Sequence, residues 1–124
     1  MRVLVVDDEP AARAKLRRLL HAHADVSEVA EAADAPAALA ALARQGFELA
    51  ILDIEMPGGS GLQLAAQLPT RCRCVFSTAY GEHALQAFEL GALDYLLKPY
   101  TAERLAATLD RVRAQLALPA PAPT

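Results

Sequence analysis

The chain alternates short apolar runs with stretches of helical periodicity, and it does so five times. The first unit shows the pattern: residues 3–6 read Val-Leu-Val-Val, and apolar residues then recur at helical spacing as far as Leu20. An unbroken apolar run of this length is typical of a strand buried on both faces. Strands are therefore predicted at residues 3–6, 26–32, 47–52, 74–77 and 93–97, each followed by a helix.

The predicted helices begin and end at residues suited to those positions. Asp34, Ser60 and Thr101 carry side-chain oxygens that can cap a helix N-terminus, and Gly46 and Gly91 are placed to end helices. The apolar residues expected to face the core are Ala12, Leu16, Leu19 and Leu20 in the first helix, Leu39, Leu42 and Ala43 in the second, Ala84, Leu85 and Phe88 in the fourth, and Leu105, Leu109, Val112 and Leu116 in the last.

Five strand–helix units predict an α/β fold. Right-handed crossovers place such helices on both faces of a doubly wound, five-stranded parallel sheet. The flavodoxin-like strand order 2-1-3-4-5 is common for a sheet of this size, and its ligand site lies at the carboxyl ends of the strands, where the first and third strands part. We therefore expect the functional residues just past those strand ends.

Polar side chains follow each of the central strands. Asp7 and Asp8 come after the first strand, Asp53 after the third, Thr78 after the fourth and Lys98 after the fifth. The predicted topology gathers these groups into one crevice. Only two of the twelve basic residues are lysines, which favours a chemical requirement for Lys98, whereas the other lysine, at position 15, is expected to be an ordinary surface residue.

The three carboxylates Asp7, Asp8 and Asp53 would repel one another without a cation. Mg²⁺ prefers oxygen ligands and typically keeps waters and a phosphate oxygen in its coordination sphere. A carboxylate beside such a metal can attack phosphorus, and an ammonium group such as that of Lys98 suits a single phosphate oxygen. The crevice is therefore predicted to perform Mg²⁺-dependent phosphoryl transfer to an aspartate.

Charge and composition argue against several other classes. The formal charge of −3 is spread along the chain, so a nucleic-acid surface is not expected, and no apolar stretch reaches the length of about 18 residues that suggests a membrane span. A signal peptide is not expected either, so the protein is predicted to be cytoplasmic. Cys72 and Cys74 are interpreted as reduced thiols on a core strand, and no special role is expected for the histidines, which are His21, His23 and His83.

Several blocks of the sequence resemble bacterial two-component response-regulator receiver domains. The blocks are VLVVDDEP, LAILDIEMPGGSGLQLA, FSTAY and GALDYLLKPY, in matching order and spacing as far as about Leu116. The particular form of the second block, together with STAYGEHALQAFELGALDYLLKPY, is similar to receivers of the LytTR class (LytR/AlgR-like), which are joined by a linker to a β-rich DNA-binding domain. The resemblance implies a receiver domain at residues 1–117 and a Pro/Ala-rich linker or tail at residues 118–124.

The same resemblance implies roles for the crevice residues. Asp53 would accept the phosphoryl group from a sensor histidine kinase. Mg²⁺ would be bound by Asp8 and Asp53, with Asp7 acting through water and the backbone carbonyl of Glu55 completing the set. Lys98 would contact the phosphoryl group.

Further positions are implied to transmit the signal. Thr78 would contact the phosphoryl group and turn inwards, and Tyr95 would be the aromatic switch that follows it. Pro99 would follow a cis peptide that aims the preceding lysine inwards. Glu55 and Tyr80 occupy the two variable positions that tune the lifetime of the phosphate.

Alternative functions remain open at this point. The favoured one is a non-enzymatic switch, for which only self-phosphorylation and self-dephosphorylation are expected. Phosphorylation would change the face made by helix 4, strand 5 and helix 5, which would then form a homodimer or control an output domain beyond Thr124. DNA binding is expected only through that output domain. A stand-alone receiver acting on other proteins is the second. A Mg²⁺-dependent aspartyl-phosphate phosphatase is a third, although such hydrolases carry an Asp where this chain has Glu55. A phosphorylation-independent pseudo-receiver is a fourth, but no acidic residue or lysine of the set is missing. The glycine-rich run 56–61 lacks the ending of a nucleotide-binding loop, which argues against ATP binding there.

Overall fold

The structure, a computed structural model, describes residues 1–118. Its sheet contains the strands β1 (Arg2–Val6), β2 (Glu28–Ala32), β3 (Leu49–Leu52), β6 (Arg73–Thr78) and β7 (Asp94–Leu97). Its helices are α1 (Pro10–His21), α2 (Ala35–Arg44), α3 (Gly61–Ala65), α4 (Ala84–Glu89), the short 3₁₀ turn η1 (Gly81–His83) before it, and α5 (Ala102–Leu116). The predicted tail at residues 119–124 lies outside the described residues.

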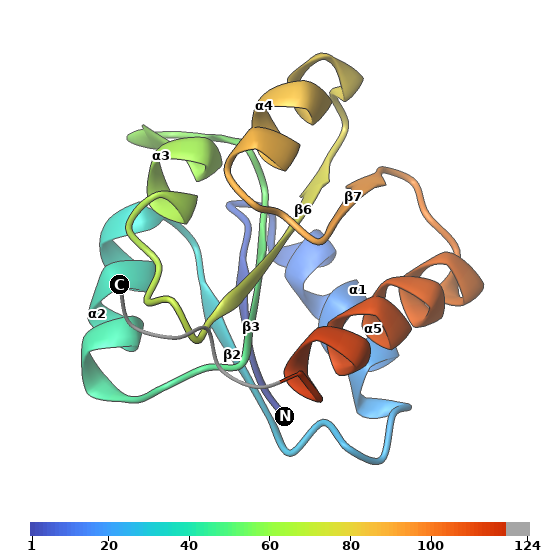
Figure 1. The fold of residues 1–124 in the computed structure, drawn as a ribbon. Coiled ribbons are helices and arrows are strands. Elements are labelled where there is room, and N and C mark those ends of the chain that lie inside the picture. The colour runs from blue at the N-terminus through green and yellow to red at the C-terminus, as the bar shows by residue number, and fades with distance from the viewer. Residues whose placement is uncertain (119–124) are drawn as a thin grey trace.

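All strands of the main sheet run parallel in the order β2-β1-β3-β6-β7 (Figure 1). This is the predicted order 2-1-3-4-5, because the two intervening strands in chain order, β4 (Glu55–Met56) and β5 (Gly59–Ser60), form a separate small hairpin. The hairpin falls largely within the glycine-rich run 56–61. The first and third strands are neighbours at the centre, and the chain leaves them in opposite directions, so their carboxyl ends form the expected crevice.

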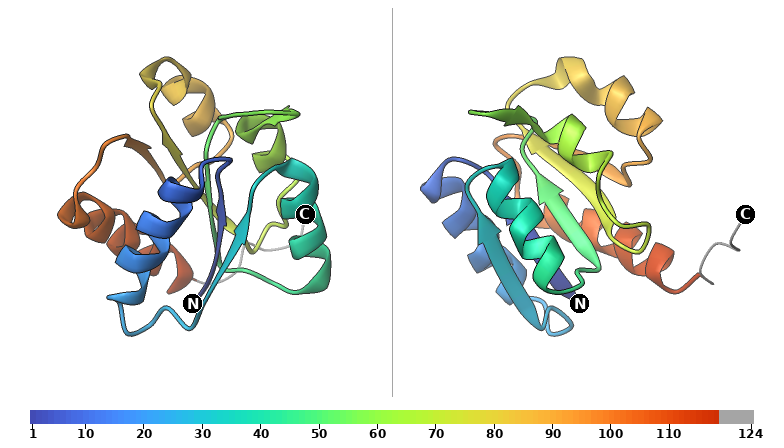
Figure 2. Two further views of the ribbon diagram at one scale, coloured as in Figure 1. Left: turned by 180° about the vertical axis from the view of Figure 1, so that it is seen from behind. Right: turned by 90° about the vertical axis from the view of Figure 1, so that its left-hand side faces the viewer.

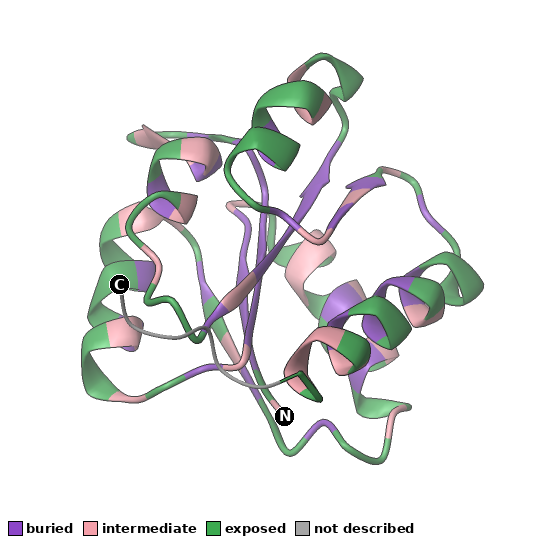
Figure 3. Cartoon of the chain, viewed as in Figure 1, coloured by how far each residue is buried: buried purple, intermediate pink, exposed green. Residues whose placement is uncertain are grey.

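Helices cover both faces of the sheet. Helices α1 and α5 lie on one face and α2, α3 and α4 on the other (Figures 1 and 2). Successive side chains of β1 point to opposite faces, so Val3 and Val5 pack beneath α1 and α5 while Leu4 and Val6 pack in the other cluster. All four are at most 1% exposed, which explains why this strand is apolar without alternation, and Figure 3 shows the central strands buried along their length.

The predicted helix caps are confirmed. The Asp34 carboxylate accepts a hydrogen bond from the backbone N–H of Ala37 at 2.8 Å, and the Ser60 hydroxyl accepts one from Leu62 at 3.1 Å. Thr101 caps α5 in the same way. Among residues 1–118, no helix is both long enough and apolar enough to cross a membrane.

The predicted buried face of α4 is wrong. Leu85 is 72% exposed and Phe88 53% exposed, whereas Ala87 is fully buried. The helix is only six residues long and lies over β6 and β7 at one edge of the sheet, so a single small residue faces the core. The apolar side chains that remain outside form an exposed patch.

The predicted stripe of α2 is also partly wrong. Leu39 is 37% exposed and Ala43 is exposed, while Ala38 and Ala41 make the buried contacts and Leu42 packs at their edge. Alanine dominates this helix, so its apolar periodicity does not distinguish one face from another. The small alanine side chains on the buried face allow the helix to approach the sheet closely.

Candidate functional site: an acidic crevice with one lysine

Carboxylates from two strand ends meet in the crevice. Asp53 continues the β3 ladder, with its N–H donating to the carbonyl of Val6 at 2.9 Å, so it lies beside the end of β1, where Asp7 and Asp8 follow. Asp7 is 1% exposed and Asp53 7% exposed. Each of the three aspartates can offer one oxygen, and these oxygens lie within 4.8 Å of one another.

Lys98 reaches the same point from the end of β7. Its ammonium lies 2.7 Å from Oδ2 of Asp7 and 3.2 Å from Oδ2 of Asp53, and it forms both ion pairs in a largely buried position. The peptide bond between Lys98 and Pro99 is cis, as the resemblance implied. Two of the three acidic residues therefore share one cation, and the site as a whole keeps an excess of negative charge.

The pKa shifts at the site arise from burial and from these neighbouring charges. Burial raises the pKa of Asp53 above its ordinary value, and the nearby charge of Asp7 raises it further, against the opposing influence of Lys98. Burial would lower the pKa of Lys98, but the hydrogen bond to Asp7 and the charges of both carboxylates outweigh it and the pKa is raised. A divalent cation bound by oxygen ligands would neutralise the remaining charge, so these residues fit Mg²⁺.

Thr78 lies at the end of β6, next to the strand that carries Asp53. It is fully buried, and its hydroxyl accepts a hydrogen bond from the N–H of Tyr80 at 3.3 Å. The predicted crevice residues from four strand ends are thus all gathered at one edge of the sheet.

A family model described as the response regulator receiver domain matches residues 3–110. The chain belongs to this family. It is 44% identical over 115 residues to the transcriptional regulatory protein BtsR of Salmonella typhi, a match covering 91% of this chain and 48% of that protein. It is 39% identical over 118 residues to the sensory transduction protein LytT of Bacillus anthracis, covering 93% of this chain and 48% of that protein. The chain spans about half the length of these curated relatives, and their names agree with the expected LytTR class.

Solved receiver structures share the fold. The response regulatory domain of mrkE from Klebsiella pneumoniae is 34% identical with a TM-score of 0.86, over 94% of this chain and 98% of that one. The response regulator TrrA of Thermotoga maritima, in complex with Mg²⁺-BeF, is 31% identical with a TM-score of 0.78, over 90% of this chain and 97% of that one. Receiver domains bind Mg²⁺ at the acidic pocket, which agrees with the donor set found here.

The receiver's two predicted switch residues meet at Tyr80. The Tyr95 hydroxyl donates to the carbonyl of Tyr80, while Thr78 accepts from the N–H of the same residue. The ring of Tyr95 also packs against Phe76 of β6, with centroids 6.4 Å apart. Tyr80 was predicted only as a variable flanking position, and its backbone contacts with both switch residues could not be found from the sequence.

Gly61 is a receiver residue whose importance the sequence did not reveal. Its N–H donates to the carbonyl of Ile54 at 2.8 Å, and a Cβ placed on it would lie 2.0 Å from the carbonyl oxygen of Asp53. Only glycine allows the start of α3 to approach the Asp53 backbone this closely. The sequence offered a weak signal, a glycine directly after the capping Ser60 in the glycine-rich run 56–61.

Lys15 was predicted to be an ordinary surface residue, and this was wrong. Its ammonium donates to the carbonyl of Tyr100 at 3.0 Å and lies 4.5 Å from the centre of the Tyr100 ring. Tyr100 follows the cis Lys98–Pro99 peptide, so α1 is attached to the loop that carries the site lysine.

The side chain of Glu55, whose backbone carbonyl was the predicted ligand, groups with Glu82 and His83 and not with the three aspartates. It is exposed and lies 3.5 Å from His83, for which no role was expected. Cys72 and Cys74 are both buried free thiols in the described chain, as predicted, but only Cys74 lies on the strand β6, because Cys72 directly precedes it.

Proposed function

We propose that Asp53 accepts a phosphoryl group from a sensor histidine kinase, with Mg²⁺ bound by Asp8 and Asp53, through water by Asp7, and by the backbone carbonyl of Glu55. The observation that carries this proposal is the convergence of three carboxylates, each offering one oxygen within 4.8 Å of the others, two of which pair with the ammonium of Lys98. A purely structural site would neutralise its charges, whereas this one keeps uncompensated negative charge. That charge can bind a divalent cation, which can in turn bind a phosphoryl group.

In the proposed reaction an Asp53 oxygen attacks phosphorus. The O–P bond forms while the P–N bond to the kinase histidine breaks, and the leaving imidazole takes the electron pair. Lys98 already lies 3.2 Å from Asp53 and would neutralise one phosphoryl oxygen. Bound Mg²⁺ supplies charge neutralisation at a second oxygen. The Thr78 hydroxyl would leave the N–H of Tyr80 and donate to a third.

The contacts at Tyr80 support a route from the site to the surface. When Thr78 turns inwards, the segment held by the Tyr95 hydroxyl is released, and the surface of α4, β7 and α5 rearranges. Leu85, Phe88 and Leu97 are exposed apolar residues on α4 and β7. We infer that the phosphorylated domain uses this surface for a homodimer or for an output domain.

The relatives suggest what the signal controls. The chain matches about half of each curated relative, and BtsR is a transcriptional regulatory protein. We propose that residues 1–117 are the receiver part of a regulator with a LytTR-type DNA-binding domain, and that residues 118–124 form the linker to it. We also propose that the protein acts in the cytoplasm, where its kinase partner would phosphorylate it. A stand-alone receiver remains the second candidate, and beyond self-phosphorylation and self-dephosphorylation we propose no enzymatic activity.

The test is phosphorylation of the purified protein with acetyl phosphate and Mg²⁺, followed by intact mass. The wild type should gain one phosphoryl group, Asp53→Asn none, and chelation of Mg²⁺ should abolish the gain. Beryllofluoride should change the oligomeric state of the wild type and leave Asp53→Asn unaffected. If the wild type gains no mass and does not respond to beryllofluoride, the switch proposal fails. Steady phosphate release from many small phosphoesters would support a phosphatase instead.

A further inference from the structure

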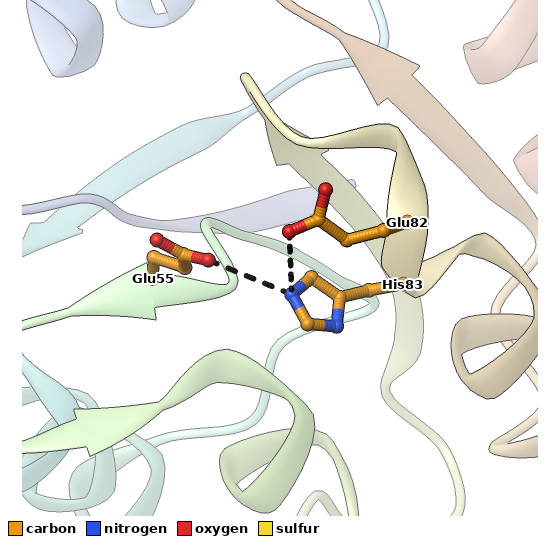
Figure 4. A group of neighbouring side chains, drawn as sticks. All are labelled: Glu55, Glu82 and His83. Carbon is orange, nitrogen blue, oxygen red and sulfur yellow. Dashed lines mark ion pairs between the residues drawn. The ribbon is translucent and has the colours of Figure 1, made fainter.

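A second group of possible ligand side chains contains none of the three aspartates and shares with the proposed Mg²⁺ site only Glu55, whose backbone carbonyl is assigned there. Glu55 of β4 and the neighbouring pair Glu82 and His83 of η1 point toward one another, as Figure 4 shows. Nε2 of His83 lies 3.5 Å from Oε1 of Glu55 and 4.0 Å from Oε1 of Glu82. One donor atom from each of the three residues lies within 4.8 Å of the others. The group joins two segments that are far apart in the sequence, so adjacency along one helix does not explain it.

The other ring nitrogen of His83 determines what faces the two carboxylates. Nδ1 lies 3.4 Å from Oε1 of Gln86, a contact in which Nδ1 would be the donor, because an amide oxygen can only accept. In that tautomer of the neutral ring, Nε2 would be an acceptor that faces two carboxylate oxygens. Three acceptors directed at one point repel each other unless a cation lies between them. A hydrogen bond from the distal nitrogen is also the usual way in which a metal-binding histidine is oriented.

We propose that Glu55, Glu82 and His83 form a second cation site that binds a divalent transition metal of the Zn²⁺ type. One imidazole nitrogen and two carboxylate oxygens suit such ions, whereas Mg²⁺ prefers oxygen ligands alone. Zinc bonds of about 2.0–2.1 Å place tetrahedral ligand atoms roughly 3.3–3.4 Å apart. The separation of 3.5 Å between His83 and Glu55 is already close to this value, and Glu82, which is exposed, needs only a small side-chain rotation.

The surroundings provide room for the remaining ligand. Glu55 and His83 border an open hollow of about 540 Å³, which is also lined by Ile54, Met56 and Pro57. Water can therefore complete the coordination, and the ion can enter directly from solvent. The bound metal would link β4, which follows the phosphoacceptor strand, to η1, which leads into α4.

A proton on His83 is the competing explanation, since an imidazolium would also satisfy both carboxylates. Metal binding separates the two. We would titrate the full chain with Zn²⁺ by isothermal calorimetry in saturating Mg²⁺, which occupies the aspartate crevice. The wild type should bind one Zn²⁺, His83→Gln should weaken binding at least tenfold, and the matched control His21→Gln, at an exposed histidine of α1, should bind as the wild type does.

Two further measurements locate the ion. Asp8→Asn removes a carboxylate of the crevice and should leave Zn²⁺ affinity unchanged. Hydrogen exchange in residues 81–83 should slow on addition of Zn²⁺ in the wild type and not in His83→Gln. The proposal is overturned if the wild type shows no saturable binding, if His83→Gln binds as tightly as the wild type, or if Asp8→Asn abolishes binding. A thiolate-to-metal absorption band with Co²⁺ would also overturn it, because the ion would then lie at the cysteines.

Discussion

Replacing Gly61 with alanine should displace the backbone of Asp53, the proposed phosphoacceptor, without removing any charged side chain. The new Cβ would lie 2.0 Å from the carbonyl oxygen of Asp53, 2.9 Å from its carbonyl carbon and 3.0 Å from Cα of Ile54. Ordinary contacts begin near 3.5 Å, so the backbone at Asp53 or the start of α3 must move by on the order of 1–1.5 Å. No flexible side chain is available to absorb the shift.

The size of the effect follows from that displacement. Overpacking of this kind costs about 1–3 kcal/mol, and a clash with backbone falls at the upper end, which for a domain of this size lowers the melting temperature by about 10 °C. A misplacement of about 1 Å in a reacting group can reduce a rate roughly 100-fold. We therefore expect Gly61→Ala to fold less stably and to be phosphorylated on Asp53 about 100 times more slowly.

The assay is the rate of mass gain with acetyl phosphate and Mg²⁺, measured well below the melting temperature of the variant. Gly59→Ala is the matched control, because its Cβ would meet only the Cβ of Ala35 at an ordinary distance of 3.6 Å. It should melt and react like the wild type. Equal behaviour of Gly61→Ala and the wild type in both measurements would refute the reasoning, and equal losses in the two variants would attribute the effect to the loop in general.

Three other predictions concern buried contacts elsewhere. Burial opposes ionisation of Asp94, but hydrogen bonds from Arg104 and a neighbouring threonine outweigh it and lower the pKa to about 2. Because the folded pKa lies below the unfolded one, Asp94→Asn should lower the free energy of unfolding by about 1–2 kcal/mol at pH 7, allowing for the partly exposed arginine. The difference between the variant and the wild type should shrink as the pH falls from about 4 to about 2. Urea unfolding at pH 7 and pH 3 measures this difference, and a difference that stays constant would contradict its ionic origin. Burial raises the pKa of Cys74 to about 12, so iodoacetamide at neutral pH should label this thiol only after unfolding, and mass spectrometry should find it unmodified in the native protein. Lys15→Met should lower the free energy of unfolding by about 1 kcal/mol, because the hydrogen bond and the cation–π contact to Tyr100 are lost. The control Arg18→Met in the same helix should leave the stability unchanged in thermal unfolding. Equal losses in the two variants would argue against a specific contact.

The main elements were predictable because their signals are local. Strand β1 is apolar on both faces because helices cover both sides of the sheet. The unbroken apolar run Val3–Val6 therefore predicts a strand that is buried on both faces. The caps at Asp34, Ser60 and Thr101 depend on the next two or three residues, so they too could be predicted. The strand order follows from general rules of connection and handedness once five strand–helix units are recognised.

Helix faces were harder where packing decides them. In α4 the apolar residues Leu85 and Phe88 are more hydrophobic than Ala87, yet only the alanine lies in the core. Periodicity assumes that a helix buries its most apolar side. A short helix at the sheet edge with an exposed apolar surface breaks that assumption.

The sequence by itself determined the acidic crevice, because residues that directly follow parallel strands must lie at the same edge of the sheet. Asp53, Asp8 and Lys98 could thus be brought together without coordinates. Only the tertiary structure decided which groups meet across separate loops: that Lys15 contacts Tyr100, that Gly61 lies against the carbonyl of Asp53, and that His83 faces Glu55. Those contacts depend on ångström-scale distances between elements, which are set by how whole helices pack and leave no periodic mark in the sequence.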